Sequence, residues 1–217
     1  GVKSNTVTGA NPASLNGRTD TATIDFWEPP VIAKAFSPAT IGAGGTSTLT
    51  ITLTNPAANP GPVTGAAFSD TLANMSVAGN QSVGGTCAGI TPASLANGQA
   101  GLIAFSGIGI PQGGSCTVTF TVTSTNVGVN PNATTGVTST QAPTAGAGSA
   151  VANLTVAGTA LTKAFSPATI TAGTVSRLPF TIANGAGNPA QPLLAFTETL
   201  PAGVTIAGPA NAVTDCA

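Results

Sequence analysis

Hydrophobic and polar residues alternate along most of this chain with a period of two, which is the spacing of side chains on opposite faces of a β-strand. The apolar positions of the clearest runs are Leu49, Ile51 and Leu53; Cys116, Val118, Phe120 and Val122; Ala152, Leu154 and Val156; and Ala22, Ile24 and Phe26. The positions between them are mostly threonine, which suits the solvent face of a strand. Each run is therefore expected to have one packed face and one wet face, as in an antiparallel sandwich.

Helix signals are weak, because Gly and Pro interrupt the sequence too often for a 3.6-residue apolar stripe to persist. Turn-forming segments separate the alternating runs, for example 55–61 and 111–114. The spacing of these turns gives about seven to nine short strands per repeat, as in an immunoglobulin-like domain. We predict an all-β fold built from tandem immunoglobulin-like antiparallel β-sandwiches.

An internal repeat divides the chain. The octapeptide at 34–41 recurs unchanged at 163–170, which is 129 residues later, and Cys87 and Cys216 lie at matching distances behind the two copies. A fixed period of this kind indicates an array of similar domains.

The repeat predicts three segments. Residues 1–30 are the C-terminal part of a preceding repeat, residues 31–158 form a complete repeat, and residues 159–217 are the N-terminal part of the following one. The partial repeats are completed either within a longer parent chain or by neighbouring chains. We expect the longer parent chain.

Cys87 and Cys116 are the strongest local chemical signal. Two cysteines per repeat in an extracellular chain are typical of a structural disulfide. The alternation places Cys116 inward, and the alternative is a pair of unbonded buried thiols. Cys216 repeats the position of Cys87, so its partner is expected beyond the fragment.

Lys34 and Asp70 are the only charged residues between Val31 and Gly158, and Lys163 and Glu198 occupy matching places in the next repeat. One interpretation is a surface ion pair, worth about 0–1 kcal/mol. The other is a Lys–Asp amide crosslink. That chemistry would favour a second carboxylate nearby, and the next repeat carries Glu instead of Asp.

The connector between the first two segments holds the only tryptophan, Trp27, followed by Pro29 and Pro30. An exposed indole can stack on a sugar. More often such a residue fills the contact between adjacent domains with its large apolar surface. We expect Trp27, Pro29 and Pro30 to form the contact between repeats, stiffened by the prolines.

The amino-acid composition argues against several classes of function. Charged residues make up 5% of the chain, the net charge is −1, and there is no histidine. No basic patch supports nucleic-acid binding, and no apolar run approaches the ~20 residues that span a bilayer. Catalytic triads and the commonest metal ligand need histidine. We therefore expect no catalytic residues, no metal site, no cofactor and no enzymatic activity.

Four blocks of the sequence resemble a known family: 34–41, 44–55, 68–72 and 113–122. They are similar to the tandem immunoglobulin-like repeats, of undefined function, in very large secreted bacterial surface proteins. The resemblance covers nearly the whole chain. It implies an extracellular array of β-sandwich beads at the bacterial cell surface, with no catalytic or ligand-binding residues to transfer.

Three functions remain. In the first, the repeats build a stiff stalk, sheath or filament whose partners are adjacent repeats or further copies of the chain. In the second, they form an adhesin or ligand-binding module, with carbohydrate as one ligand class. In the third, they are a passive spacer that displays a distant functional domain. The low charge, the repetition and the predicted disulfide favour the structural role.

Overall fold

The computed structural model describes residues 2–8, 19–185, 188, 190–191, 194–210 and 212–216. Every regular element among these residues is a β-strand, so the prediction of an all-β sandwich fold is confirmed. No helix in the described part of the chain is long and apolar enough to cross a membrane. The chain forms two compact units, with the main division after Gly158.

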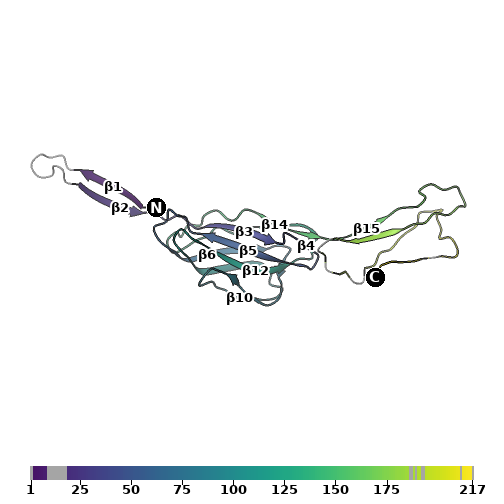
Figure 1. Ribbon diagram of the computed structural model, residues 1–217, viewed down its shortest axis with the longest axis horizontal. Coiled ribbons are helices and arrows are strands. Elements are labelled where there is room, and N and C mark those ends of the chain that lie inside the picture. The colour runs from purple at the N-terminus through teal and green to yellow at the C-terminus, as the bar shows by residue number, and fades with distance from the viewer. Residues whose placement is uncertain are drawn as a thin grey trace, which may run out of the picture. The chain divides into compact units, whose positions relative to one another are not determined.

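The strands of the central repeat gather into one body (Figure 1). They are β3 (Val31–Ser37), β4 (Thr40–Gly42), β5 (Thr46–Thr54), β6 (Val63–Leu72), β7 (Ser76–Val77), β8 (Gln81–Ser82), β9 (Gly84–Gly85), β10 (Ser94–Leu95), β11 (Gly101–Ile110), β12 (Ser115–Thr123), β13 (Gly128–Asn132) and β14 (Ala152–Ala157).

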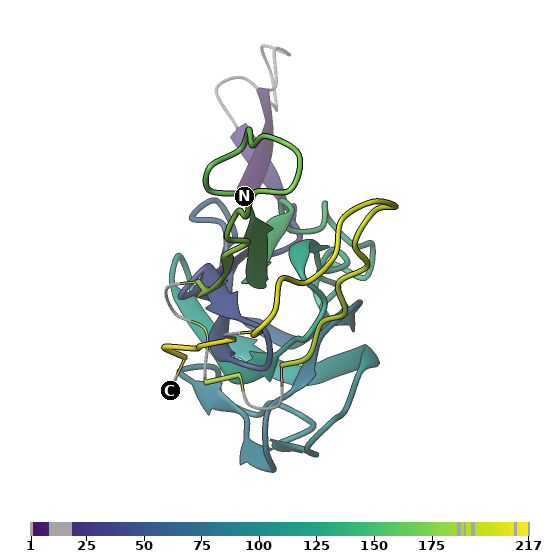
Figure 2. The same ribbon diagram turned by 90° about the vertical axis from the view of Figure 1, so that its right-hand side faces the viewer.

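One layer of the sandwich is a sheet with the order β3-β5-β12-β7, in which β9 also pairs with β12. On the other side of the core, β6 pairs with β11, and Thr134 and Thr138 extend the pairing of β6 by single bridges. A third sheet, β13-β14-β4, contains a parallel pairing between β14 and β4. Figure 2 views these strands from one end.

The core follows from the alternation in the sequence. Leu49, Ile51 and Leu53 of β5 are fully buried, as are Val118 and Val122 of β12. The register brings the two apolar runs directly together, since Leu49 lies opposite Phe120 and Leu53 opposite Cys116. The predicted inward faces of these two strands are therefore those of the structure.

Aromatic rings connect the two layers through the core. The ring of Phe105 on β11 stacks on Phe68 of β6 with centroids 5.1 Å apart, and it lies 5.9 Å from the ring of Phe120 on β12. Aromatic pairs at these separations stabilise a core beyond their buried area.

The N-terminal segment forms a hairpin of β1 (Val2–Thr8) and β2 (Thr19–Asp25), paired antiparallel with each other. The described side chains of this hairpin are exposed, including Ile24 on the face that the sequence pattern predicted to be packed. The prediction of a packed face is wrong for this hairpin in the structure, because among the described residues β2 pairs only with β1 and no second layer covers it.

The second unit contains β15 (Thr159–Lys163) and β16 (Phe180–Asn184), which pair antiparallel. Lys163 lies opposite Phe180, just as Lys34 lies opposite Ile51 in the central repeat. The hydroxyl of Ser176 donates to the carbonyl of Pro167 at 2.7 Å, and Ser47 donates to Pro38 at the same distance. The second unit thus repeats the local structure of β3 and β5, although its strands are largely exposed.

Candidate functional site

The two charged residues of the central repeat meet inside its core. Lys34 lies on β3 between the inward-facing Ile32 and Phe36, and Asp70 lies on β6 between Phe68 and Leu72. The strands belong to different sheets, so this ion pair crosses the sandwich. The Lys34 ammonium donates a hydrogen bond to Oδ2 of Asp70.

One interpretation of the sequence placed this ion pair at the surface, but the structure buries it. Both side chains are 0% exposed, and the surface placement is therefore wrong. The inward phase of β3 and β6 explains the difference, because a residue two positions from a core residue on a strand faces the core as well.

Burial changes the chemistry of this pair. Loss of hydration lowers the pKa of the Lys34 amine, and the neighbouring Asp70 carboxylate opposes that shift without cancelling it. Oδ1 of Asp70 is buried and has no hydrogen-bond partner. An oxygen in that position loses its hydration without replacement, which is unfavourable.

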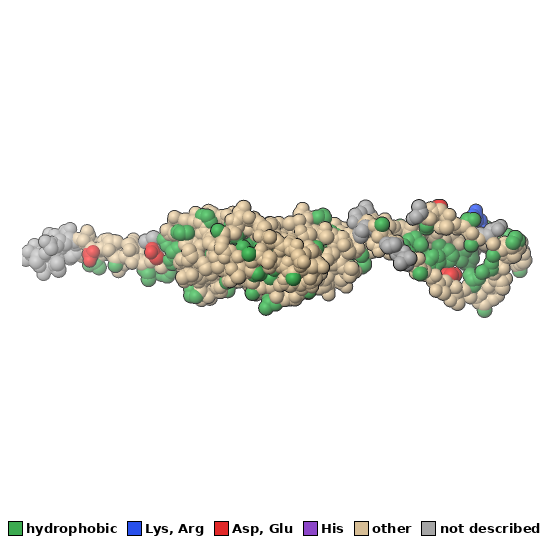
Figure 3. All heavy atoms as spheres, turned by 90° about the horizontal axis from the view of Figure 1, so that it is seen from below, with side chains coloured by type: hydrophobic (Ala, Val, Ile, Leu, Met, Phe, Trp, Pro, Cys, Tyr) green, Lys and Arg blue, Asp and Glu red, His purple; other side chains and the backbone are tan. Residues whose placement is uncertain are grey.

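Because Lys34 and Asp70 are the only charges between residues 31 and 158, the surface of the central repeat carries no charged side chain. Figure 3 shows the visible face of the large central body without acidic or basic side chains. Its polar surface is made of uncharged side chains and backbone. Little electrostatic repulsion therefore keeps copies of this surface apart.

Cys87 and Cys116 form a disulfide that links the segment after β9 to the start of β12. It closes a loop with a sequence separation of 29 residues. Cys116 is buried and Cys87 is half-buried against the core. Cys216, at the matching place in the second unit, is a free and exposed thiol.

The connector that precedes β3 is held against the end of the central repeat. Trp27 is partly buried and packs on the core, where its ring lies beside Gly61. The Asn59 side chain holds the backbone of Glu28, the residue after Trp27, at both its amide and its carbonyl. Its Oδ1 accepts from the Glu28 backbone amide at 2.8 Å, and its Nδ2 donates to the Glu28 carbonyl at 2.9 Å.

Asn59 is itself positioned by a second asparagine. Its Nδ2 donates to Oδ1 of Asn55 at 2.8 Å, and Nδ2 of Asn55 donates to the carbonyls of Gly61 and Pro111 at 3.0 Å. Both asparagines are buried. Such a satisfied polar network fixes one arrangement of the chain.

The prolines of the connector also contact the repeat. Pro30 is buried and Pro29 is half-buried. A Cβ placed on Gly146 would lie 3.1 Å from the Pro29 ring, so the segment around Gly146 approaches that ring closely. Trp27, Pro29 and Pro30, the residues predicted for an inter-repeat contact, are thus all on the N-terminal end of the central repeat.

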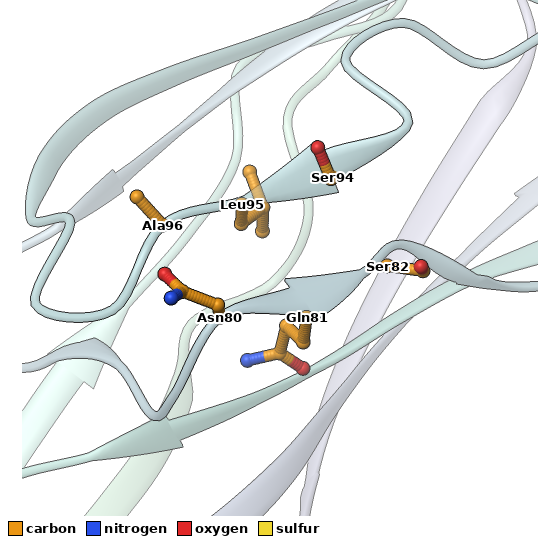
Figure 4. Close-up of a pocket in the computed structure, with 6 residues that line it drawn as sticks. All are labelled: Asn80, Gln81, Ser82, Ser94, Leu95 and Ala96. Carbon is orange, nitrogen blue, oxygen red and sulfur yellow. The ribbon is translucent and has the colours of Figure 1, made fainter.

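A shallow surface hollow lies between β8 and β10 (Figure 4). One of its two amide side chains, Gln81, is bonded to the protein itself: Nε2 donates to the carbonyls of Ala78 and Thr121, and Oε1 accepts from the Thr121 amide. Asn80 accepts from the Asn97 amide. The hollow has no aromatic lining and no charged group, so it lacks the convergent groups of a typical ligand site.

Among the described residues, no three acidic or cysteine side chains gather where a metal could be held. The features that stand out in the central repeat are therefore the buried ion pair, the disulfide and the connector contact.

Comparison with known proteins places the sequence in a family. The model of a domain of unknown function, DUF7933, matches residues 30–156 and again residues 159–217. The chain belongs to this family. The two DUF7933 matches meet where the compact units divide, after Gly158.

No curated protein matches the sequence. Among solved structures, the chain is similar to the full-length major pilin SpaD from Corynebacterium diphtheriae, with 14% sequence identity and a TM-score of 0.40. The match covers 57% of the DUF7933 chain and 34% of the pilin chain.

Sequence reasoning missed Asn59, which binds the connector, and Asn55, which orients Asn59. Asn55 and Asn59 recur as Asn184 and Asn188 in the second copy of the repeat, which marks them as part of the DUF7933 pattern in this chain. The repeat could have singled them out, but only the fold shows that Asn59 binds the Glu28 backbone and that Asn55 orients the Asn59 side chain.

Proposed function

We propose that this chain is a structural segment of an extracellular bacterial surface fibre, sheath or filament, in which DUF7933 repeats act as stiff beads. One observation carries the proposal: the chain entering the central repeat is docked onto it by Trp27 and by the Asn59 bracket around Glu28. A passive spacer would not require the connector to be held in one position on the repeat.

Three further properties support this function. The disulfide constrains the bead and suits an oxidising extracellular setting. The absence of exposed charge on the central repeat favours close packing of beads, either along a chain or between neighbouring chains. The β3 and β5 register recurs in the second unit, which supports an array of such repeats.

The adhesin alternative lacks a comparable observation. In the hollow between β8 and β10, the Gln81 amide and the Asn80 side-chain oxygen are bonded to the protein itself. Trp27 is partly buried against the core rather than freely exposed. Catalysis is not part of the proposal, since the chain has no histidine and the single carboxylate of the central repeat is paired with Lys34.

Electron microscopy of the native protein on the cells that produce it tests this function. We expect regular fibres or sheets whose axial repeat matches the length of one bead. Isolated flexible threads that end in a distinct head would contradict the proposal and support the spacer function. Specific binding of the intact repeats to one class of glycan on an array would support the adhesin function instead.

A further inference from the structure

Lys34 and Asp70 are an amine and a carboxyl group held in contact, on opposite sheets, in a core that excludes water. We propose that they are joined by an amide bond between Nζ of Lys34 and Cγ of Asp70, which forms an intrachain crosslink across the sandwich. This inference does not depend on the proposed function, because it concerns the chemistry of one buried pair.

The fold brings the reacting groups together before any reaction. Lys34 is anchored on β3 by its pairing with Ile51 of β5, and Asp70 is anchored on β6 by its pairing with Ile103 of β11. The two side chains therefore reach toward each other from rigid strands. Holding reactants in contact in this way replaces an encounter in solution and lowers the barrier to bond formation.

The core also removes what normally prevents the reaction. In water, hydration stabilises the ammonium and the carboxylate, and neither charged form condenses. Here both side chains are 0% exposed, so the charged forms lose that hydration. The lowered pKa of Lys34 follows from the same desolvation and increases the share of neutral, nucleophilic amine.

The step balances without an added reactant. One proton moves from the Lys34 ammonium to the Asp70 carboxylate, which gives a neutral amine beside a neutral acid. The Nζ lone pair attacks Cγ, the bond from Cγ to one oxygen breaks, and that hydroxyl leaves with a second proton from Nζ as water. No oxidant or reductant takes part. Residues 31–158 contain no second carboxylate, so the proton passes within the pair.

The product suits this core better than the ion pair does. Before reaction, Asp70 presents one oxygen to Lys34 and a second buried oxygen that has no partner. Condensation removes one oxygen as water and both charges with it. A buried ion pair contributes little net stability because of its desolvation, whereas a neutral amide avoids that cost.

The second unit offers an internal contrast. Lys163 donates to both carboxylate oxygens of Glu198 at 2.8 Å, so these groups are also in contact. Their side chains are 54% and 22% exposed, however, and water stabilises the charges. We expect no bond between them in this chain.

The test is mass spectrometry of the full chain, produced in an oxidising compartment and then reduced and denatured. We expect a mass lower than that of the sequence by one water molecule. Trypsin cuts after unmodified Lys, so an unlinked chain gives the fragments 19–34 and 35–163, whereas the linked chain gives one fragment, 19–163, lighter by one water.

Two variants serve as controls. Lys34→Met should restore the full mass, and Lys163→Met should keep the loss of one water. The proposal does not rest on Lys34→Met folding, since the wild-type chain alone decides it. A wild-type chain with its disulfide formed, the full sequence mass and complete cleavage after Lys34 would overturn the crosslink. Loss of water together with cleavage after Lys34 would place the loss elsewhere and overturn it as well.

Discussion

The central repeat and the second unit each carry a lysine–acid pair at matching positions of the sequence repeat, but the two pairs differ in their exposure to solvent. Lys34 and Asp70 are completely enclosed, whereas Lys163 and Glu198 remain in contact with water. The local strand register is the same in both units. The difference lies in what surrounds the strands.

In the central repeat, β6 and β11 cover the inner face of the β3-β5-β12-β7 sheet and exclude water from Lys34. In the second unit the described strands are the β15–β16 pair, and its apolar side chains such as Phe165, Phe196 and Ile206 are exposed. The comparison shows that the chemistry of a charged pair depends on the completed sandwich and not on the sequence motif alone.

The largest expected effect separates the two pairs directly. Asp70→Ala leaves the Lys34 amine buried without a partner, which should lower the free energy of unfolding by about 3–5 kcal/mol or more. Glu198→Ala, its match in the second unit, should change it by about 0–1 kcal/mol. Denaturant titration followed by Trp27 fluorescence measures the first change, because Trp27 is the only tryptophan and packs on the central core. Hydrogen exchange at the backbone amides of the β15–β16 pair measures the second change. Equal effects of both changes would contradict the distinction.

The cysteines give the next largest contrast. Replacing Cys87 and Cys116 together by Ala opens a loop with a sequence separation of 29 residues, which should lower the stability of the central repeat by about 3.5 kcal/mol. Cys216→Ala changes an exposed, unbonded thiol and should stay within about 0.5 kcal/mol. The same fluorescence titration in non-reducing buffer measures the double variant, and hydrogen exchange at the β15–β16 backbone amides measures Cys216→Ala. A stable double variant would mean that the core alone holds the bead.

The connector contact should show a smaller effect. Asn59→Ala removes both hydrogen bonds to Glu28 and the one to Asn55, and it should cost about 1–3 kcal/mol. Hydrogen exchange should also become faster at the Glu28 amide. Asn153→Ala, at an exposed position of β14, is the matched control and should stay within about 0.5 kcal/mol. Unchanged protection at Glu28 would show that Asn59 does not hold the connector.

Ionic strength should have the smallest effect. The central repeat has no exposed charge, so raising the salt concentration within the screening range should leave its unfolding transition nearly unchanged. The exposed Lys163–Glu198 contact, by contrast, should be weakened by screening. Circular dichroism at several salt concentrations measures the unfolding transition, and proton NMR of the Lys163 side chain at the same concentrations measures its contact with Glu198. A strong salt dependence of the central repeat would reveal charges that interact through its surface.

Much of the fold was predictable, because strand alternation is a local property. The inward faces of β5 and β12 could be derived from the spacing of Leu49 and Val118 with their neighbours. The hairpin face around Ile24 was not, since burial needs a second layer that alternation does not supply. The same limit applied to Lys34. Strand alternation could place its side chain on the inward face of β3, but could not show that β6 packs over it.

The connector residues divide in a similar way. Trp27, Pro29 and Pro30 drew attention by their type, and the structure places them against the central repeat. The bracket formed by Asn59 depends on contacts between residues 31 positions apart in the sequence. Long-range hydrogen bonds of this kind carry no local pattern, so they emerge only from the folded chain.

The most direct measurement of the central claim, that the bead is a crosslinked structural unit, is single-molecule stretching of the oxidised full chain from its two ends. We expect that the segment between Lys34 and Asp70 is never released in the wild-type chain, and that Lys34→Met releases it as additional extension. Equal extension of the wild-type and Lys34→Met chains would contradict the claim, because it would show that only non-covalent contacts close the sandwich at this point.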